Sequence, residues 1–320
     1  MENKFKVSMS PHIHEKEGIS GIMLDVLIAL FPACIAGIYY FGYRAAMVLL
    51  TALASSVLFE YLYVKLMKKK NTTRDLSAMV TGILIGLNMP STIPLWMVVV
   101  GSGFAIIIVK QLYGGIGKNF MNPALAARCF MLISWAGAMS QFAEPGMVDI
   151  ISEATPLGVM KGVTDGNIPT VNSAFWGSIP GCIGETSVFA LLIGFVYLLV
   201  RKVISWKIPV TYVLVFGVLT YFFGKNATNM PTLDYTMLQI FTGGLMIGAV
   251  FMATDYTTTP TTPLGLYIFG AGCGILTFLF RNFGGYPEGV SFAILLMNIL
   301  VPQIDKFTVP KKFGEVKKNA

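Results

Sequence analysis

The chain has 320 residues, of which 55% are apolar and only 12% carry a charge. A soluble domain has roughly a quarter charged residues, and its polar surface cannot be built from so few. Composition therefore excludes a soluble enzyme, a disordered chain and a nucleic-acid-binding domain, and the net charge of +7 needs another explanation. The four cysteines lie far apart without a CxxC pair, which argues against a disulfide scaffold or a cysteine-bound cluster.

Apolar runs of spanning or near-spanning length follow one another from residue 22 to residue 302, after a charged segment that does not resemble a secretory signal. Since a helix needs ~20 apolar residues to cross a bilayer, the pattern predicts an all-α polytopic membrane protein with about ten transmembrane helices. The predicted spans are 22–42, 44–67, 76–90, 94–112, 120–139, 185–201, 207–224, 236–254, 264–281 and 288–302. The third and tenth are short, so we expect them to be tilted, broken or partly buried in protein.

Basic residues set the expected orientation of these spans. With a cytoplasmic N-terminus, eighteen of the twenty-three Lys and Arg residues fall on the inner side and four on the outer side, while Arg128 lies within a span. Cytoplasmic segments carry such an excess, so the tails at 1–21 and 303–320 are predicted to be cytoplasmic. The stretch 140–184 is then an extracytoplasmic loop. The basic runs have a topogenic role rather than a role in nucleic-acid binding.

The sequence contains a weak internal repeat. Residues 81–86 (TGILIG) recur at 242–248 (TGGLMIG), and Asn122-Pro123 at the fifth span resembles Tyr286-Pro287 at the tenth. Five spans is an odd number, so the two halves would run in opposite directions as a 5+5 inverted repeat. Such repeats place their working site at the interface between the halves, where broken helices line a cavity. Chance recurrence of Thr-Gly-aliphatic strings is the alternative. The two membrane repeats are predicted at 22–139 and 185–302.

The few polar residues in the predicted spans are candidates for chemistry. Arg128 lies eight residues into its span, where a charge costs ~3 kcal/mol, so we expect it to face the bundle interior and contact an anionic or carbonyl partner. Asp255 and neighbouring threonines offer oxygen ligands and hydroxyl donors at a membrane-embedded break, suited to a cation or a polar ring system. A hydrogen-bonded turn is the alternative there. A solvated or capping role fits the acidic residues nearer span ends, which are Asp25, Glu60, Glu185 and Glu288.

Two other motifs give no site. Residues 114–119 (GGIGKN) resemble a phosphate-binding loop but fit neither the P-loop nor the dinucleotide-binding template. His12 and His14 lie two residues apart, but the sequence has no further histidine or suitably spaced cysteine to complete a metal site. We therefore predict no metal site, and a docking contact of the N-terminal tail is the favoured interpretation of the two histidines.

Six motifs are together specific to one family, although each alone is not. They are Ser10–Ile13, Gly114–Asn119, Asn122–Arg128, Pro180–Ser187, Phe251–Asp255 and Tyr286–Val290. Through them the chain resembles, nearly end to end, the D subunit of the Rnf ion-translocating oxidoreductase complex and its relative, the B subunit of the sodium-pumping NADH:quinone oxidoreductase. The short N-terminal segment is more similar to that of the Rnf complex.

This resemblance implies bound flavin. The family carries FMN on a threonine, through a phosphoester, in a Ser/Thr-x-Ala-Thr motif, which here is Ser152-Glu153-Ala154-Thr155. Thr155 is thus the expected attachment site, and the count of basic residues independently places it outside, where the family's flavin transferase acts. A second, non-covalent flavin (riboflavin) is expected at the repeat interface. The candidate cofactor-binding residues are Thr155, Ser152, Ala154, Arg128, Asn119, Asn122 and Asp255, and no catalytic residue is expected.

The resemblance also implies a redox subunit of a translocase that is not catalytic alone. Electrons would pass between ferredoxin and NAD through iron–sulfur and flavin centres, coupled to Na⁺ or H⁺ movement across the inner (cytoplasmic) membrane. The expected partners are the A, B, C, E and G subunits of the Rnf complex, the flavin transferase and the lipid bilayer. One alternative is the flavin-bearing subunit of a sodium-pumping, quinone-reducing complex. The other is a channel or secondary transporter for a small solute, which the inverted repeat alone would favour.

Overall fold

The computed structural model describes residues 18–69, 72–146, 155–162, 164, 166–226, 230–285 and 288–309. Within these ranges all regular secondary structure is helical, as the apolar pattern predicts. The helices before the gap at 147–154 are α1 (Ile19–Leu66), η1 (Thr73–Asp75), α2 (Ser77–Leu87), α3 (Leu95–Gly103), η2 (Phe104–Gln111), α4 (Pro123–Ser134) and α5 (Ala136–Met139). Those after it are α6 (Pro156–Met160), α7 (Val171–Trp176), α8 (Val188–Val200), α9 (Lys207–Phe223), α10 (Thr232–Phe241), α11 (Leu245–Ile247), η3 (Gly248–Met252), α12 (Pro263–Phe283) and α13 (Val290–Thr308).

Several of these helices are suited to a bilayer. By length and apolar composition α1, α12 and α13 can each cross a membrane, and α10 with α11 and η3 forms a fourth candidate that is bent by 59° at a break. The remaining apolar helices are shorter, at 10–17 residues. Large apolar side chains on the outer faces are exposed, including Tyr39, Leu66 and Phe222, as expected of helices that face lipid. The described chain is therefore a helical membrane protein.

Helix α1 is two apolar segments joined at Gly42. A straight helix of its 48 residues would be about 72 Å long, more than twice the ~30 Å of a hydrocarbon core. Gly42 breaks it with a backbone conformation of φ 66° and ψ −152°, which glycine adopts without the steric penalty of a side chain. Gly42 is the last residue of the predicted span 22–42, so the break falls at the predicted boundary with the span 44–67.

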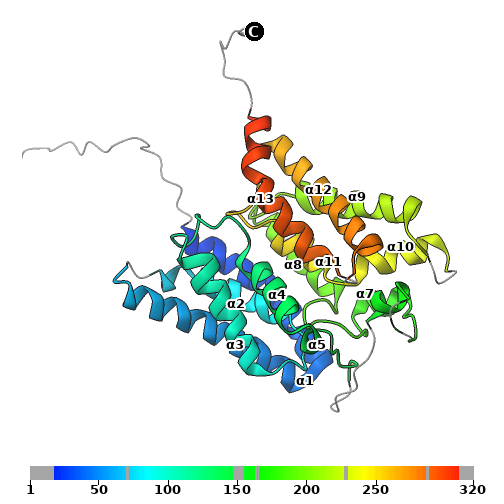
Figure 1. Ribbon diagram of the computed structural model, residues 1–320, viewed down its shortest axis with the longest axis horizontal. Helices are drawn as coiled ribbons and strands as arrows, with labels where there is room; N and C mark the ends of the chain where they lie inside the picture. The colour runs from blue at the N-terminus through cyan, green and yellow to red at the C-terminus, as the bar shows by residue number, and fades with distance from the viewer. Residues whose placement is uncertain are drawn as a thin grey trace, which may run out of the picture.

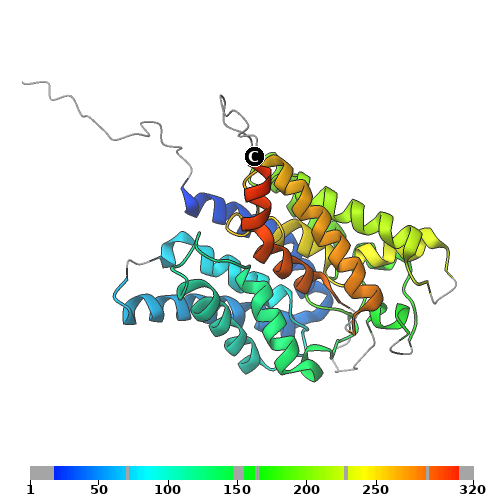
Figure 2. The ribbon, with the colours of Figure 1, turned by 45° about the horizontal axis from the view of Figure 1, so that its top comes forward.

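The helices form two groups that lie side by side (Figures 1 and 2). The group from α1 to α5 is coloured blue to green, and the group from α8 to α13 is coloured green to red. Helix α1 packs on α8 and α4 packs on α13 across the boundary between them. Near the start of α1, the carboxylate of Asp25 accepts hydrogen bonds from Tyr197 Oη at 2.8 Å and from Arg201 at 3.1–3.3 Å. Both partners belong to the second group, so this contact ties the two groups together.

Candidate functional site

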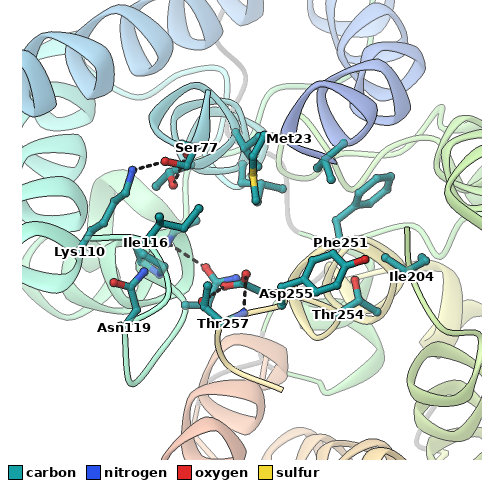
Figure 3. A pocket seen from close by; sticks show the side chains of 18 of the residues that line it. Met23, Ser77, Lys110, Ile116, Asn119, Ile204, Phe251, Thr254, Asp255 and Thr257 are labelled. Carbon is teal, nitrogen blue, oxygen red and sulfur yellow. Dashed lines mark hydrogen bonds between the residues drawn. The ribbon is translucent and has the colours of Figure 1, made fainter. Parts of the chain in front are cut away.

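A pocket of about 720 Å³, including its opening, lies between the two groups of helices (Figure 3). We call it the interface pocket. Figure 3 shows Met23 of α1 and Phe251 of η3 on its apolar side, with Asn119, Asp255 and Thr257 on its polar side. Apolar walls with a few convergent polar groups are the usual pattern of a binding site for a small organic molecule.

The structure brings Asn119, Asn122 and Asp255 to this one pocket. Asn122 caps α4, because its Oδ1 accepts from the backbone N–H groups of Ala124 and Leu125 at 3.0 and 3.3 Å. The Asp255 carboxylate accepts from Thr257, at 3.4 Å from the backbone nitrogen and 3.1 Å from the hydroxyl. Asn119 differs from both, since its Oδ1 is buried and has no hydrogen-bond partner. A buried acceptor left unsatisfied costs about 1–3 kcal/mol, so a ligand donor at Asn119 would be favourable.

A buried ion pair lies at the edge of the interface pocket. Lys110 of η2 is 2% exposed, and its Nζ lies 3.1 Å from Glu60 Oε2 and 2.6 Å from Ser77 Oγ. Glu60 also accepts from Gln111 at 2.7 Å and from Thr72 at 2.8 Å. The sequence pattern predicts a topogenic role for Lys110 and a solvated or capping role for Glu60, so it misses this pair. The available signal is that Lys110 lies inside the apolar run 94–112, where a lysine needs a partner.

A second polar cluster surrounds Arg128, which is 4% exposed. Its guanidinium donates to Asn88 Oδ1 at 2.7 Å, to Glu185 Oε1 at 2.9 Å, to Cys182 Sγ at 3.5 Å and to the carboxylate of Glu288. We call these five residues the arginine cluster. The expectation that Arg128 faces the bundle interior and has an anionic partner is confirmed.

The arginine cluster also joins the two groups of helices. Arg128 and Asn88 belong to the first group, and the three other members come from segments that precede α8 and α13. Ligand atoms of Cys182, Glu185 and Glu288 lie within 4.8 Å of one another, close enough to hold a metal ion. The guanidinium of Arg128 contacts all three, so this side chain already supplies the positive charge that the two carboxylates need.

The helix break between α10 and α11 passes beside the arginine cluster. Gly243 and Gly244 have φ values of +67° and +69°, which side-chain-bearing residues rarely adopt. A Cβ atom at Gly243 would collide with Leu157, and one at Gly244 would lie 2.8 Å from Glu185 Oε1. Both glycines are therefore required by the backbone conformation and by the close approach of these neighbours.

Arg281 of α12 satisfies backbone carbonyl groups at this break. Its guanidinium donates to the carbonyl oxygens of Thr242 and Gly243, both at 3.0 Å, and to that of Gln239. It also lies over the ring of Phe216, 5.0 Å from the centroid. Gln239 lies in the last turn of α10, where a helix end leaves four carbonyls unpaired, and Thr242 and Gly243 lie in the break itself. The sequence pattern does not identify Arg281 as a site residue.

Thr155 begins the short helix α6. Its Oγ1 accepts from the backbone N–H of Gly158 at 3.2 Å, and Pro156 occupies the first turn, as is common at helix starts. Thr155 lines a pocket of about 240 Å³, including its opening, together with Glu185, Glu288 and Gly243. We call this the Thr155 pocket, and it places the threonine beside the carboxylates that pair with Arg128. Ser152 and Ala154 of the proposed attachment motif, like His12 and His14, lie outside the described residues.

Buried ion pairs, broken helices and polar pockets between two groups of apolar helices are typical of one class of membrane protein. Members of this class bind or move ions or charged groups in their interior. The chain belongs to the NQR2, RnfD, RnfE family, whose model matches residues 6–314.

Relatives of this chain are similar over nearly the whole of both sequences. The D subunit of the Na⁺-translocating ferredoxin:NAD⁺ oxidoreductase complex of Acetobacterium woodii is 44% identical, with 100% of this chain and 99% of the relative covered. The D subunit of the proton-translocating ferredoxin:NAD⁺ oxidoreductase complex of Clostridium ljungdahlii is 42% identical, with 98% and 97% covered. The D subunit of the ion-translocating oxidoreductase complex of Yersinia enterocolitica is 36% identical, with 97% and 98% covered.

Proposed function

We propose that this chain is the D-type membrane subunit of an ion-translocating ferredoxin:NAD⁺ oxidoreductase of the Rnf type, and that it holds flavin as an electron carrier. The observation that carries the proposal is the position of Thr155, whose hydroxyl lies at a helix start in a pocket walled by Glu185 and Glu288. The names and full-length similarity of the relatives support the assignment to this complex. The chain contributes to a translocase and is not catalytic alone.

In this proposal FMN is attached to Thr155 through a phosphoester, with Ser152 and Ala154 completing the motif. The residues present fit the group. Thr155 caps α6 through an oxygen lone pair, and its hydroxyl donates to none of the described residues, so replacing the hydroxyl hydrogen by phosphorus keeps the cap. When bound, FMN supplies the electron-transfer chemistry. The chain holds the attachment oxygen in place, and Arg128 fixes the two carboxylates beside it.

The interface pocket is the proposed site of a second, non-covalent flavin (riboflavin). Its apolar walls suit an aromatic ring system. Asn119 offers an unsatisfied buried acceptor, and Asn122 and Asp255 add polar groups on the same side of the pocket. In this role the three residues would orient the ring, and Met23 and Phe251 would exclude water from it.

The proposed topology has ten spans in a 5+5 inverted repeat, with both termini cytoplasmic and Thr155 on the outer side of the inner membrane. The break of α1 at Gly42 and the bent pair α10 and α11 support it, because each makes the helices correspond to the predicted spans. A C-terminal fusion to green fluorescent protein should fluoresce, and alkaline phosphatase fused after Gly162 should be active. The opposite result at either fusion would contradict the orientation.

The partners in this proposal are the A, B, C, E and G subunits of the complex and a flavin transferase that acts on the outer side. The coupling ion is Na⁺ or H⁺, and the relatives' names include both. Assays of the purified complex with ferredoxin and NAD⁺, with and without Na⁺, separate these cases.

The covalent flavin can be tested on the purified chain. Thr155→Ala should abolish in-gel flavin fluorescence and the FMN-sized mass adduct, because it removes the oxygen that forms the ester. Thr170→Ala is the matched control, since Thr170 caps α7 in the same way, accepting from Ser173 N at 3.2 Å. The control should keep the full signal. Fluorescence that persists in Thr155→Ala would contradict the attachment site.

Two other functions predict different results in these assays. A quinone-reducing complex would share the flavin on Thr155 but reduce quinone with NADH instead of exchanging electrons between ferredoxin and NAD⁺. A small-solute channel or transporter would be colourless and would conduct its solute without partner subunits. The quinone-reducing and Rnf proteins belong to the same family, so the acceptor assay decides between them.

A further inference from the structure

Beside the Thr155 pocket lies a further cavity, of about 670 Å³ including its opening, and both are lined by Leu157. Its lining includes three basic side chains, so we call it the basic cavity. They are Lys161, directly after α6, Lys225, just after α9, and Arg281 of α12. No carboxylate is among its described lining residues. The function proposed above assigns no role to this cavity.

Two of these positive charges have no carboxylate bonded to them within the described chain. Arg281 is 5% exposed, its other nitrogens bond neutral carbonyl and amide oxygens, and its Nε is buried without a partner. Lys225 forms no ion pair in the described residues, and its Nζ lies over the Phe283 ring at 4.6 Å from the centroid. Desolvation and the nearby charge of Lys225 both lower the pKa of Lys161. A walled site with such an excess attracts an anion.

The other walls of the basic cavity favour an anion that belongs to an aromatic ring. Leu157 and Met160 provide apolar surface, and Tyr235 provides an aromatic ring. Tyr235 donates from its hydroxyl to the backbone oxygen of Lys225 at 3.0 Å, and Gln239 donates to Tyr235 at 3.3 Å. These bonds hold the cationic and aromatic parts of the wall in one arrangement. A free inorganic anion would make no favourable contact with the apolar surface, whereas an aromatic ring would.

The flavin proposed at Thr155 has the matching chemistry and reach. Thr155 and Lys161 stand at the two ends of α6, six residues or roughly 9 Å apart at the helical rise, and a ribityl-phosphate tether bridges a gap of that order. Oxidised flavin is neutral. When the ring takes up two electrons and one proton at N5, a negative charge remains on its pyrimidine edge, at N1 and the C2 carbonyl.

We propose that the basic cavity receives the pyrimidine edge of the flavin attached to Thr155, and that Lys225 and Arg281 stabilise the reduced ring. The inference rests on the covalent flavin proposed above and adds the residues that set its potential. No covalent bond of the protein forms or breaks. The electrons come from a reduced iron–sulfur donor of the complex, or from dithionite in a titration, and the proton taken up at N5 comes from water. The cavity contributes positive charge.

The test measures the midpoint potential of the covalent flavin in the purified holo-complex, by dithionite titration followed in the flavin absorbance. Lys225→Gln should lower the midpoint, because the reduced ring loses a favourable charge. We expect about a fivefold change in the reduction equilibrium, ~20 mV for a two-electron couple, since Lys225 is exposed and partly screened. Lys225→Arg keeps the charge and should restore the midpoint.

Lys207→Gln is the matched control, since it makes the same change at the other end of α9, roughly 27 Å away. The midpoint potential of Lys207→Gln should equal that of the wild-type protein. If Lys225→Gln keeps its in-gel fluorescence and has the midpoint of the control, the inference is wrong while the flavin attachment stands. An equal fall in Lys225→Arg would indicate a structural effect and also overturn it.

Two further outcomes are informative. One distinguishes a free anion from the flavin as the occupant of the basic cavity, and the other distinguishes failure of this inference from failure of the proposed covalent flavin. If the midpoint is unchanged and inorganic phosphate binds the Thr155→Ala chain in a Lys225-dependent manner, the cavity is a site for a free anion. If the wild-type chain carries no covalent flavin, the covalent-flavin part of the proposed function is wrong, and this inference, which rests on it, is overturned as well.

Discussion

Glu60 is fully buried and accepts hydrogen bonds from Lys110, Gln111 and Thr72. Lys110 depends on it in turn, since the ammonium has no other carboxylate partner among the described residues. Buried pairs of this kind contribute little net stability, but removal of one partner leaves an uncompensated charge in a low-dielectric interior. The pair is therefore a point at which single and double substitutions should behave very differently.

We expect Glu60→Gln to destabilise the protein by about 3–5 kcal/mol, the usual range for breaking a buried pair. The double variant Glu60→Gln with Lys110→Met should recover much of that loss, because the unpaired ammonium is then gone. Thermal unfolding of the detergent-solubilised chain measures both. Equal destabilisation in the single and double variants would show that the charges are not coupled.

At the same scale, the sequence predicts which residues are unusual better than it predicts their partners. Arg128 is identifiable because a charge eight residues into an apolar span needs a partner. Its partners are not, because Glu185 and Glu288 lie 57 and 160 residues away in the sequence and near predicted span ends, where acids are ordinary. The count of basic residues likewise assigns Arg281 to the outer side, because it lies at the end of the predicted span 264–281. In the structure it bonds the carbonyls of a break 38–42 residues away in the sequence.

At the scale of elements, hydropathy locates the apolar segments but not their backbone conformation. The predicted spans 22–42 and 44–67 are separated where Gly42 breaks α1, since the short polar interruption and the glycine coincide. The span 236–254 instead contains α10, a break, α11 and the π-helix η3. Apolar residues fill this stretch whether or not the helix is continuous, so their count carries no sign of the break. The break lies at Gly243 and Gly244, which have positive φ values, whereas the matching string at 81–86 lies within the continuous helix α2. The repeat therefore does not mark the break either.

At the scale of the whole molecule, the candidate site residues gather where the two groups of helices meet. The interface pocket, the arginine cluster and the Asp25–Arg201 contact each combine residues from both groups. The sequence predicts an interface site from the repeat, and the structure places Asn119, Asn122 and Asp255 on one pocket there. The sequence could not predict the depth of the interface pocket, because that depth depends on how η2 and η3 pack against α1 and α8.

This arrangement makes the two proposed flavins separable by single substitutions. Asn119→Leu keeps the side-chain size but removes the unsatisfied acceptor of the interface pocket, so we expect about tenfold weaker retention of extractable flavin, equivalent to ~1.4 kcal/mol for one lost hydrogen bond. Its covalent FMN fluorescence should be unchanged, whereas Thr155→Ala should lose the fluorescence and keep the extractable flavin. Chromatography of the flavin released by denaturation, with in-gel fluorescence of the same sample, measures both. Undiminished extractable flavin in Asn119→Leu would place the second flavin elsewhere, because the pocket's one unsatisfied side-chain acceptor in the described structure would then have no part in holding it.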